Sequence, residues 1–213
     1  MIYCFFKRLF DIVLSLIALP FVLLIISIFA PIIYFTDKGP VFYNADRVGK
    51  DGKLFKMFKL RSMVVNAPDI RNADGSTYNG ENDPRVTKVG RFIRKASIDE
   101  LPQILNVLLG DMSFIGPRPA TPKILENLTD LQKERFKVRP GITGYTQMMY
   151  RNTAQGEARY LSDKYYVDNM SLSLDIKVLF KTVIKVIKKE NIYNPGSIFE
   201  PEKANGNAKE RIG

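Results

Sequence analysis

The residues best suited to chemistry are the adjacent carboxylates Asp99 and Glu100, at the start of a helix predicted over 100–109. Two interpretations are open. Ser97 and Glu100 could form a capping box, which is the simpler interpretation of the motif by itself. Alternatively, the helix begins at Asp99, which leaves Pro102 inside the first turn, where proline is tolerated. An ionised Asp99 at the positive end of the helix could then serve as a nucleophile or a metal ligand.

Several basic residues lie near this pair or on loops made rigid by proline. Arg118 stands between two prolines, and Arg139 precedes another. Fixed backbone reduces the entropy lost when an anion is bound, and guanidinium groups match phosphate oxygens in bidentate geometry. Arg94 precedes Asp99 by five residues, and Arg151 follows a glycine-containing loop. Several such cations around one carboxylate pair predict a site for a diphosphate.

The composition excludes many other kinds of catalytic site. The 213 residues include no histidine and a single cysteine, Cys4. Ser-His-Asp and Cys-His triads, histidine metal sites, cysteine-based zinc or iron–sulfur sites and a disulfide framework are therefore ruled out. The standard glycine-rich cradles for dinucleotides and nucleoside triphosphates are also absent. The net charge of +10 favours phosphorylated substrates, acidic lipids or nucleic acid as partners.

The N-terminal segment predicts association with a membrane. No charged residue occurs from Ile12 to Thr36. As a helix, this run would extend roughly 37 Å, enough for a hydrocarbon core of about 30 Å. Pro20 near its middle should kink the helix, and basic residues flank both ends, which favours a cytoplasmic position for both. A single spanning anchor and a re-entrant helix that enters, bends and returns both fit these residues.

The elements that must position the site are predicted from turn signals and periodicity. Short strands at 41–43 and 54–60 should flank an Asp-Gly turn at 50–53, with Lys59 and Arg61 on one face. The segments 113–122 and 139–144 are rich in proline or glycine and should be rigid loops. Helices are expected over 86–95, 100–109 and 123–137.

The C-terminal part contains one more clear pattern. Apolar and lysine stripes between Ile176 and Lys188 predict a basic amphipathic helix, placed either on a membrane surface or on the core. The polar stretch 66–85 should be either a functional lid or a disordered loop. Residues 191–213 are expected to form a polar tail.

Six motifs are diagnostic when taken together. They are KRLFD at 7–11, GPVFY at 39–43, FKMFKLRSM at 55–63, ASIDELPQILNVLLGDMSFIGPRP at 96–119, RPGITG at 139–144 and YYVDNMSLSLDIK at 165–177. With them the sequence resembles the monotopic phosphoglycosyl transferase family, the bacterial sugar transferases that begin glycan assembly on undecaprenyl phosphate. The long block at 96–119 is the most specific part of the resemblance. The chain is expected to be a minimal, catalytic-domain member.

The resemblance implies a two-step reaction at the cytoplasmic face of the bacterial inner membrane. Asp99 matches the aspartate that attacks the β-phosphorus of a nucleoside diphosphate sugar, with uridine as the implied base, and releases the nucleoside monophosphate. The covalent phospho-sugar then passes to undecaprenyl phosphate. Mg²⁺ is the implied cofactor, with Asp99 as its ligand, and Glu100 is the second member of the dyad. The implied substrate-binding cations are Lys59, Arg94, Arg118, Arg139 and Arg151.

The family also implies a re-entrant membrane helix, and here the chain departs from the family pattern. The usual break is a Ser-Pro pair about one helical turn further along than Pro20, which in this chain follows Leu19. The break is therefore expected one turn earlier, at Pro20, with a partial contribution of Pro31 as the alternative. The residue types and the resemblance agree on the chemistry. Phosphoryl transfer needs positioning and charge neutralisation more than a proton shuttle, so a site without histidine can perform it.

The expected fold is a membrane-associated α/β protein in three parts. Residues 1–36 form the re-entrant helix, and residues 37–190 form a compact, mostly helical catalytic domain with a small β-hairpin and amphipathic surface helices. The tail follows from 191 to 213. The alternative function is a membrane-anchored, non-catalytic module that binds anionic lipid or nucleic acid. It explains the charge and the anchor but not an acidic pair beside rigid arginine loops. An aromatic RNA-binding signature is also missing, so nucleic acid is not an expected partner.

Overall fold

The computed structural model describes residues 2–70, 78, 80, 82–150 and 156–188. Three sequence predictions therefore lie wholly or partly outside the described residues: the role of Arg151, the middle of the 66–85 loop, and the tail at 191–213. Within the described part, the fold is mostly helical, with two small two-stranded sheets.

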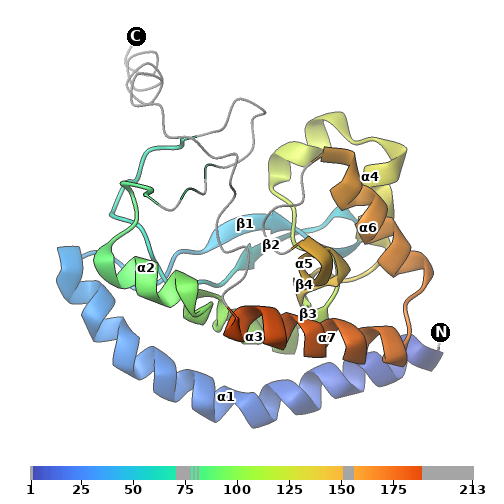
Figure 1. Ribbon diagram of the computed structural model, residues 1–213, viewed down its shortest axis with the longest axis horizontal. Coiled ribbons are helices and arrows are strands. Elements are labelled where there is room, and N and C mark those ends of the chain that lie inside the picture. Colours follow the sequence, from blue (N-terminus) through green and yellow to red (C-terminus); the bar gives the residue numbers. More distant parts are fainter. Residues whose placement is uncertain (1, 71–77, 79, 81, 151–155, 189–213) are drawn as a thin grey trace.

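Helix α1 (Ile2–Asp37) runs as a bent rod along the base of the molecule (Figure 1). It continues through Pro20 and Pro31 without interruption, so Pro20 does not end the helix. Most of its apolar side chains are exposed, and only Asp11, Ser15 and Val22 with Ile33 are buried. Among the described residues, α1 is the one helix long and apolar enough to cross a membrane.

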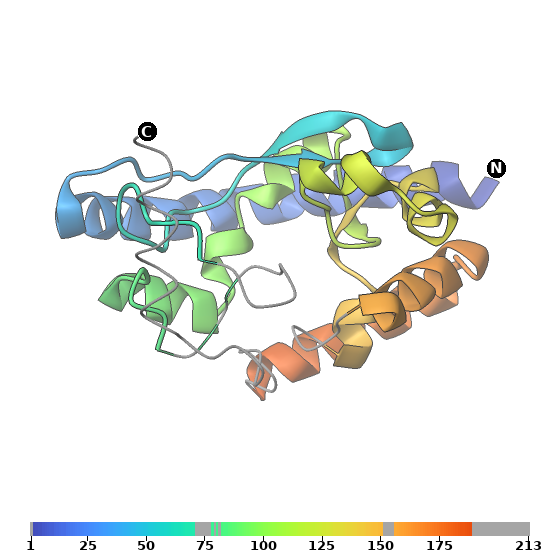
Figure 2. The same ribbon diagram turned by 90° about the horizontal axis from the view of Figure 1, so that it is seen from above.

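Both halves of α1 pack against the rest of the chain. Figure 2 shows helix α2 (Lys88–Lys95) beside the C-terminal half and helix α7 (Leu172–Ile187) beside the N-terminal half. Near the N-terminus, Lys7 Nζ lies 2.5 Å from Asp175 Oδ2 on α7. Near the other end, Ile33 is buried in one apolar cluster with Leu60 and Ile93. The whole length of α1 is thus attached to one domain.

The predicted hairpin is present. Strand β1 (Ala45–Val48) pairs antiparallel with β2 (Leu54–Met57), and Asp51 and Gly52 form the turn with φ values of 57° and 76°. An Asp-Gly pair favours this left-handed turn geometry. Strand β2 is shorter than the predicted 54–60, and β1 lies at Ala45–Val48 rather than at the predicted 41–43, where a single bridge joins Phe42 to Leu60.

The side chain of Asn106 forms hydrogen bonds with the backbone at the end of β2. Asn106 is fully buried and belongs to helix α3 (Gln103–Leu109). Its amide nitrogen donates to the carbonyl of Lys56, and its oxygen accepts from the backbone nitrogen of Phe58. One side chain therefore takes the place of a neighbouring strand.

The two segments predicted to be rigid loops contain a pair of strands. Strand β3 (Ser113–Ile115) pairs in parallel with β4 (Gly141–Thr143). The chains approach so closely at Gly116 and Gly141 that a Cβ on either glycine would collide with the other's backbone. This contact fixes the loop that leads from Gly116 to Arg118.

The helices agree with the sequence predictions in two places and differ in a third. Helices α2 and α3 lie within the ranges 86–95 and 100–109, and Gly110 ends α3 with a φ of 96°. The single helix predicted over 123–137 is wrong. A 3₁₀ segment (Pro122–Asn127), helix α4 (Asp130–Glu134) and a second 3₁₀ segment (Arg135–Lys137) occupy it. The cause is Thr129, which forms a capping box with Gln132 and starts a new helix.

Helices α5 (Tyr145–Tyr150), α6 (Gly156–Asp168) and α7 complete the domain. One side of helix α7 packs on the core, as in the second of the two positions considered for it. Val178 is buried in a cluster with Ile115, Met148 and Tyr166. The other side of α7 exposes an apolar stripe of Leu172, Ile176, Phe180 and Val183.

Candidate active site

The carboxylate pair lies in a 3₁₀ turn (Ile98–Glu100) between α2 and α3. Ser97 precedes the turn with a φ of 57° and makes no side-chain capping bond, so the capping-box interpretation is wrong. The helical turn begins at Ile98, and Pro102 precedes α3. The alternative is confirmed in one respect, because Pro102 falls where its missing N–H costs little, but the α-helix begins at Gln103 rather than at Asp99.

Lys59 links the two carboxylates. Its Nζ atom lies 2.8 Å from Asp99 Oδ2 and 3.2 Å from Glu100 Oε1. The backbone explains this placement, because the nitrogen of Leu60 donates to the carbonyl of Asp99 across 2.9 Å. The chain leaving β2 is therefore hydrogen-bonded to the dyad turn at the residue next to Lys59.

Arg118 approaches the dyad from the other side. Its NH2 atom donates to Glu100 Oε1 across 2.6 Å, and the side chain is 37% exposed. Burial alone would raise the pKa of Glu100, but the positive charges of Arg118 and Lys59 outweigh it and hold that pKa well below its usual range. In turn, Glu100 raises the pKa of Arg118. Glu100 is therefore a permanent anion that holds two cations in place.

Asp99 differs from Glu100 because only one of its two carboxylate oxygens contacts a described cation. The residue is only 2% exposed, and Lys59 contacts its Oδ2 atom. No described residue forms a hydrogen bond with its Oδ1 atom. The described residues also contain no group of three or more acidic or cysteine side chains that could hold a metal ion. Asp99 thus offers one carboxylate oxygen, next to cations, to an incoming group.

The other predicted cations make contacts elsewhere. Arg94, at the end of α2, donates from Nε to Ser62 Oγ across 2.8 Å. Arg139 donates to the carbonyl of Gly110, at the opposite end of α3 from the dyad. By the helical rise, the seven residues of α3 separate its two ends by about 10 Å. Lys59 and Arg118 are thus the predicted cations that the structure brings to the carboxylates.

Arg139 binds the same end of α3 as Arg8, which belongs to α1. Arg8 donates to the carbonyls of Val107 and Leu108, so two arginines bind the last carbonyls of α3. Cations are favourable at a helix C-terminus, where carbonyls lack partners. In this structure Arg139 therefore supports the helix that follows the dyad.

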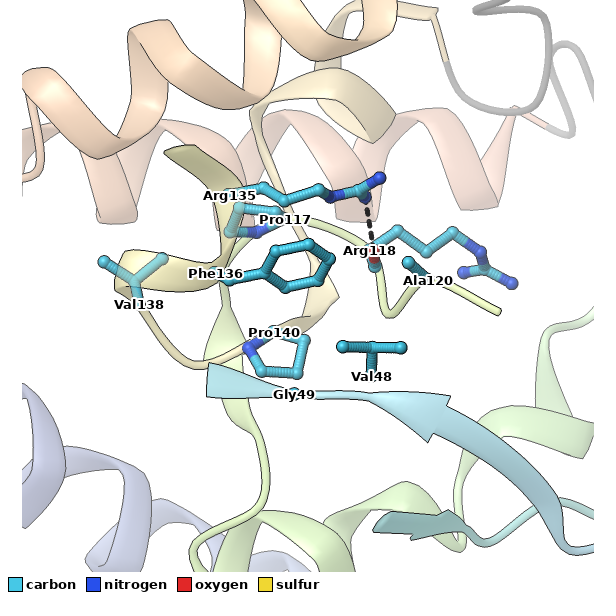
Figure 3. Close-up of a pocket in the computed structure, with 9 residues that line it drawn as sticks. All are labelled: Val48, Gly49, Pro117, Arg118, Ala120, Arg135, Phe136, Val138 and Pro140. Atoms are coloured by element: carbon cyan, nitrogen blue, oxygen red, sulfur yellow. Dashed lines mark hydrogen bonds between the residues drawn. The ribbon is translucent and has the colours of Figure 1, made fainter. Parts of the chain in front are cut away.

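A buried network behind Arg118 was missed in the sequence. Arg135 donates across 2.6 Å to the backbone carbonyl of Arg118, and in Figure 3 the Arg118 guanidinium points away from Arg135. Arg135 also pairs with Asp163 at 3.0 Å, and Thr146 donates to the same carboxylate. Arg135 and Asp163 come from separate helical segments with no spacing that links them, so no sequence signal marks the pair.

The cavity drawn in Figure 3 lies behind this loop and is small. It measures about 10 Å³ and is lined mainly by apolar residues, among them Val48, Pro117, Phe136 and Pro140. That volume holds at most about one water molecule. It is therefore a packing gap under the Arg118 loop rather than a substrate site.

A mostly helical domain with a long apolar helix and an aspartate–glutamate pair beside two cations is the arrangement expected of a sugar-phosphate transferase. Residues 2–189 match the family model of the bacterial sugar transferases, and the chain belongs to this family.

Individual relatives are similar over most of the chain. Undecaprenyl-phosphate galactose phosphotransferase of Salmonella typhimurium is 40% identical over 206 residues, which is 89% of this chain and 42% of that protein. UDP-galactose-lipid carrier transferase of Erwinia amylovora is 42% identical, with 89% and 42% covered. The chain thus spans less than half the length of these two. The uncharacterized sugar transferase EpsL of Bacillus subtilis is 42% identical, with 87% and 89% covered.

Proposed function

We propose that the protein transfers a sugar 1-phosphate from a nucleoside diphosphate sugar, with uridine as the base, to undecaprenyl phosphate. The observation that carries this proposal is the ion cluster of Lys59, Asp99, Glu100 and Arg118. It provides a carboxylate oxygen without a partner beside two cations, as phosphoryl transfer requires. The names of the Salmonella and Erwinia relatives supply the lipid carrier and the donor class.

The reaction proceeds in two displacements at one phosphorus atom. The Asp99 carboxylate attacks the β-phosphorus of the donor, and the bond from that phosphorus to the bridging oxygen breaks. The nucleoside monophosphate leaves with the bridging oxygen and its electron pair. An oxygen of undecaprenyl phosphate then attacks the same phosphorus, displaces Asp99 and yields a lipid diphosphate sugar. A covalent intermediate lets two large anionic substrates use one site in turn.

The cations near Asp99 allow the site to bind negatively charged phosphoryl groups. Lys59 and Arg118 neutralise charge that develops on the phosphoryl oxygens, while Glu100 keeps both cations oriented. Mg²⁺ fits this site, because it is typically bound by one or two carboxylates together with substrate phosphates and water. Asp99 would hold the ion, which when bound would neutralise part of the charge on the diphosphate.

The proposal includes a re-entrant α1 and a site on the cytoplasmic face of the inner membrane. Support comes from the attachment of both halves of α1 to one domain, through Lys7 at one end and Ile33 at the other. The exposed apolar sides of α1 and α7 would face lipid.

Labelling of cysteines with an impermeant maleimide tests this topology. In spheroplasts, the exposed native Cys4 and a cysteine introduced as Lys53→Cys in a Cys4→Ser background should both react only after the cells are opened. Reaction of Cys4 alone in intact spheroplasts would mean that α1 spans the membrane.

The chemistry is tested by nucleotide release from purified protein with undecaprenyl phosphate, Mg²⁺ and a panel of UDP-sugars. UMP release should require Mg²⁺ and disappear in Asp99→Asn, while Asp46→Asn, which alters an exposed ion pair, should behave as wild type. A radiolabelled sugar donor should label the wild type, but not Asp99→Asn, through a bond cleaved by hydroxylamine. Release of UDP, or full activity of Asp99→Asn, would contradict the mechanism. Lipid binding without turnover of any donor would favour the non-catalytic module.

A further inference from the structure

Next to Arg118 and Arg135 lies a third arginine that sequence reasoning did not identify. Arg159 stands in the first half of α6, one helical turn before Asp163. Asp163 pairs with Arg135, and Arg135 donates to the backbone carbonyl of Arg118, so Arg159 stands beside the network that holds the Arg118 loop. The charges of Arg135, Asp163 and Arg118 all act on Arg159. Arg118 itself also interacts with Glu100 and Asp99.

The nearby carboxylates are already engaged. Arg118 is paired with Glu100, and Arg135 is paired with Asp163, whose other oxygen accepts from Thr146. Among the residues that the structure describes, no hydrogen bond or ion pair engages the guanidinium of Arg159. Three guanidinium groups thus share the two carboxylates of Glu100 and Asp163, and Arg159 is the one left without a partner.

This leaves a cation without compensation in a partly dehydrated place. Arg159 is half-buried, and burial together with the charge of Arg135 lowers its pKa to about 10. The side chain nevertheless keeps its charge at neutral pH, since its pKa is still far above 7. A desolvated charge beside like charges is unfavourable in the empty protein, and an anion bound among them would offset that cost.

We propose that Arg159, together with Arg118, binds the phosphate that departs with the nucleoside, which is the α-phosphate of the nucleoside diphosphate donor. The inference rests on the proposed function, which places the β-phosphorus at Asp99. The second phosphate of the same diphosphate then needs cations next to the dyad, and among the described residues Arg118 contacts Glu100 while the charge of Arg159 acts on Arg118. Guanidinium groups suit this role because they bind phosphate oxygens in bidentate geometry.

The test compares Arg159→Gln and Arg159→Lys with Lys164→Gln, a matched control on the same helix whose lysine is exposed and paired with Asp168. Steady-state UMP release gives the KM for the UDP-sugar and for undecaprenyl phosphate, and the inhibition constant of UMP. In Arg159→Gln, the donor KM and the UMP inhibition constant should rise about tenfold or more, because a hydrogen bond to a charged group is lost. The KM for undecaprenyl phosphate should stay unchanged. Arg159→Lys should recover part of the loss, and Lys164→Gln should match wild type.

Two further measurements separate binding from folding and from turnover. Removal of a cation that has no partner should leave Tm unchanged or higher, whereas loss of a structural residue would lower it. Calorimetric binding of UMP to the full-length protein should weaken in Arg159→Gln to the same extent as the inhibition constant. Equal UMP affinity of wild type and Arg159→Gln overturns the inference, as does a rise confined to the KM for undecaprenyl phosphate. If wild type releases no UMP from any donor, the proposed function fails instead.

Discussion

Replacement of Arg85 by methionine should destabilise the protein more than the loss of any exposed ion pair. Arg85 is 5% exposed and binds Asp83, which is fully buried, through two hydrogen bonds of 2.9 and 2.8 Å. It also donates to the carbonyls of Pro68 and Tyr78. In Arg85→Met, the one partner that the Asp83 carboxylate would keep among the described residues is the backbone N–H of residue 85.

The size of the effect follows from this burial. Removal of one partner of a buried ion pair costs about 3–5 kcal/mol, because the remaining charge is left without compensation. For a domain of this size, each 1 kcal/mol shifts Tm by about 2–4 °C. Arg85→Met should therefore lower Tm by about 6–20 °C in a thermal scan of the detergent-solubilised protein at a fixed rate.

Two variants make the reasoning refutable. Lys133→Met removes an exposed pair with Asp130 and should leave Tm almost unchanged. Asp83→Asn combined with Arg85→Met removes both charges of this buried pair, so the double variant should regain much of the Tm decrease caused by Arg85→Met. The reasoning is wrong if Arg85→Met behaves like Lys133→Met, or if the double variant is no more stable than Arg85→Met.

Three other predictions concern the site and the backbone that holds it. In Arg118→Met, the pKa of Glu100 should rise towards its ordinary value. As the pH is lowered, the residual activity of this variant should therefore begin to fall at a higher pH than the activity of wild type. An unchanged acid limb in the pH–rate profile would contradict this. Ser97→Gly should raise the free energy of unfolding by about 1 kcal/mol, because relief of the left-handed backbone, worth about 1–2 kcal/mol, exceeds the extra backbone entropy of glycine, about 0.5–1 kcal/mol. Ser97→Ala should be neutral, and a loss of about 1 kcal/mol in that variant would indicate a cap. Gly116→Ala should lower both Tm and activity, since its Cβ would lie 2.9 Å from the nitrogen of Gly141, whereas Gly52→Ala meets open space and should change activity little.

Local signals in the sequence predicted local structure well. The Asp51–Gly52 turn, the end of α3 at Gly110 and the position of α2 each depend on residues within one or two turns of the chain. The family motifs also identified Lys59 and Arg118, which the structure places against the carboxylates.

Long-range pairings were not predictable in the same way. Strands β3 and β4 were predicted as loops because their pairing depends on glycines far apart in the chain. The Arg135–Asp163 pair was missed since each residue by itself resembles an ordinary surface charge. The helix predicted over 123–137 was wrong for a local reason, because Thr129 was not weighed as a helix start.

The contacts of α1 have a consequence for how the chain is assembled. The carboxylate of Asp11 accepts from Ser113, and Lys7 binds Asp175, so these partners are separated by 102 and 168 residues. During synthesis Lys7 emerges 168 residues before Asp175. The polar groups of α1 must therefore be accommodated by water, lipid headgroups or insertion machinery until α7 docks. We expect this docking to be a late step of assembly, so that the final depth of α1 in the bilayer is set by α7 rather than by α1 alone.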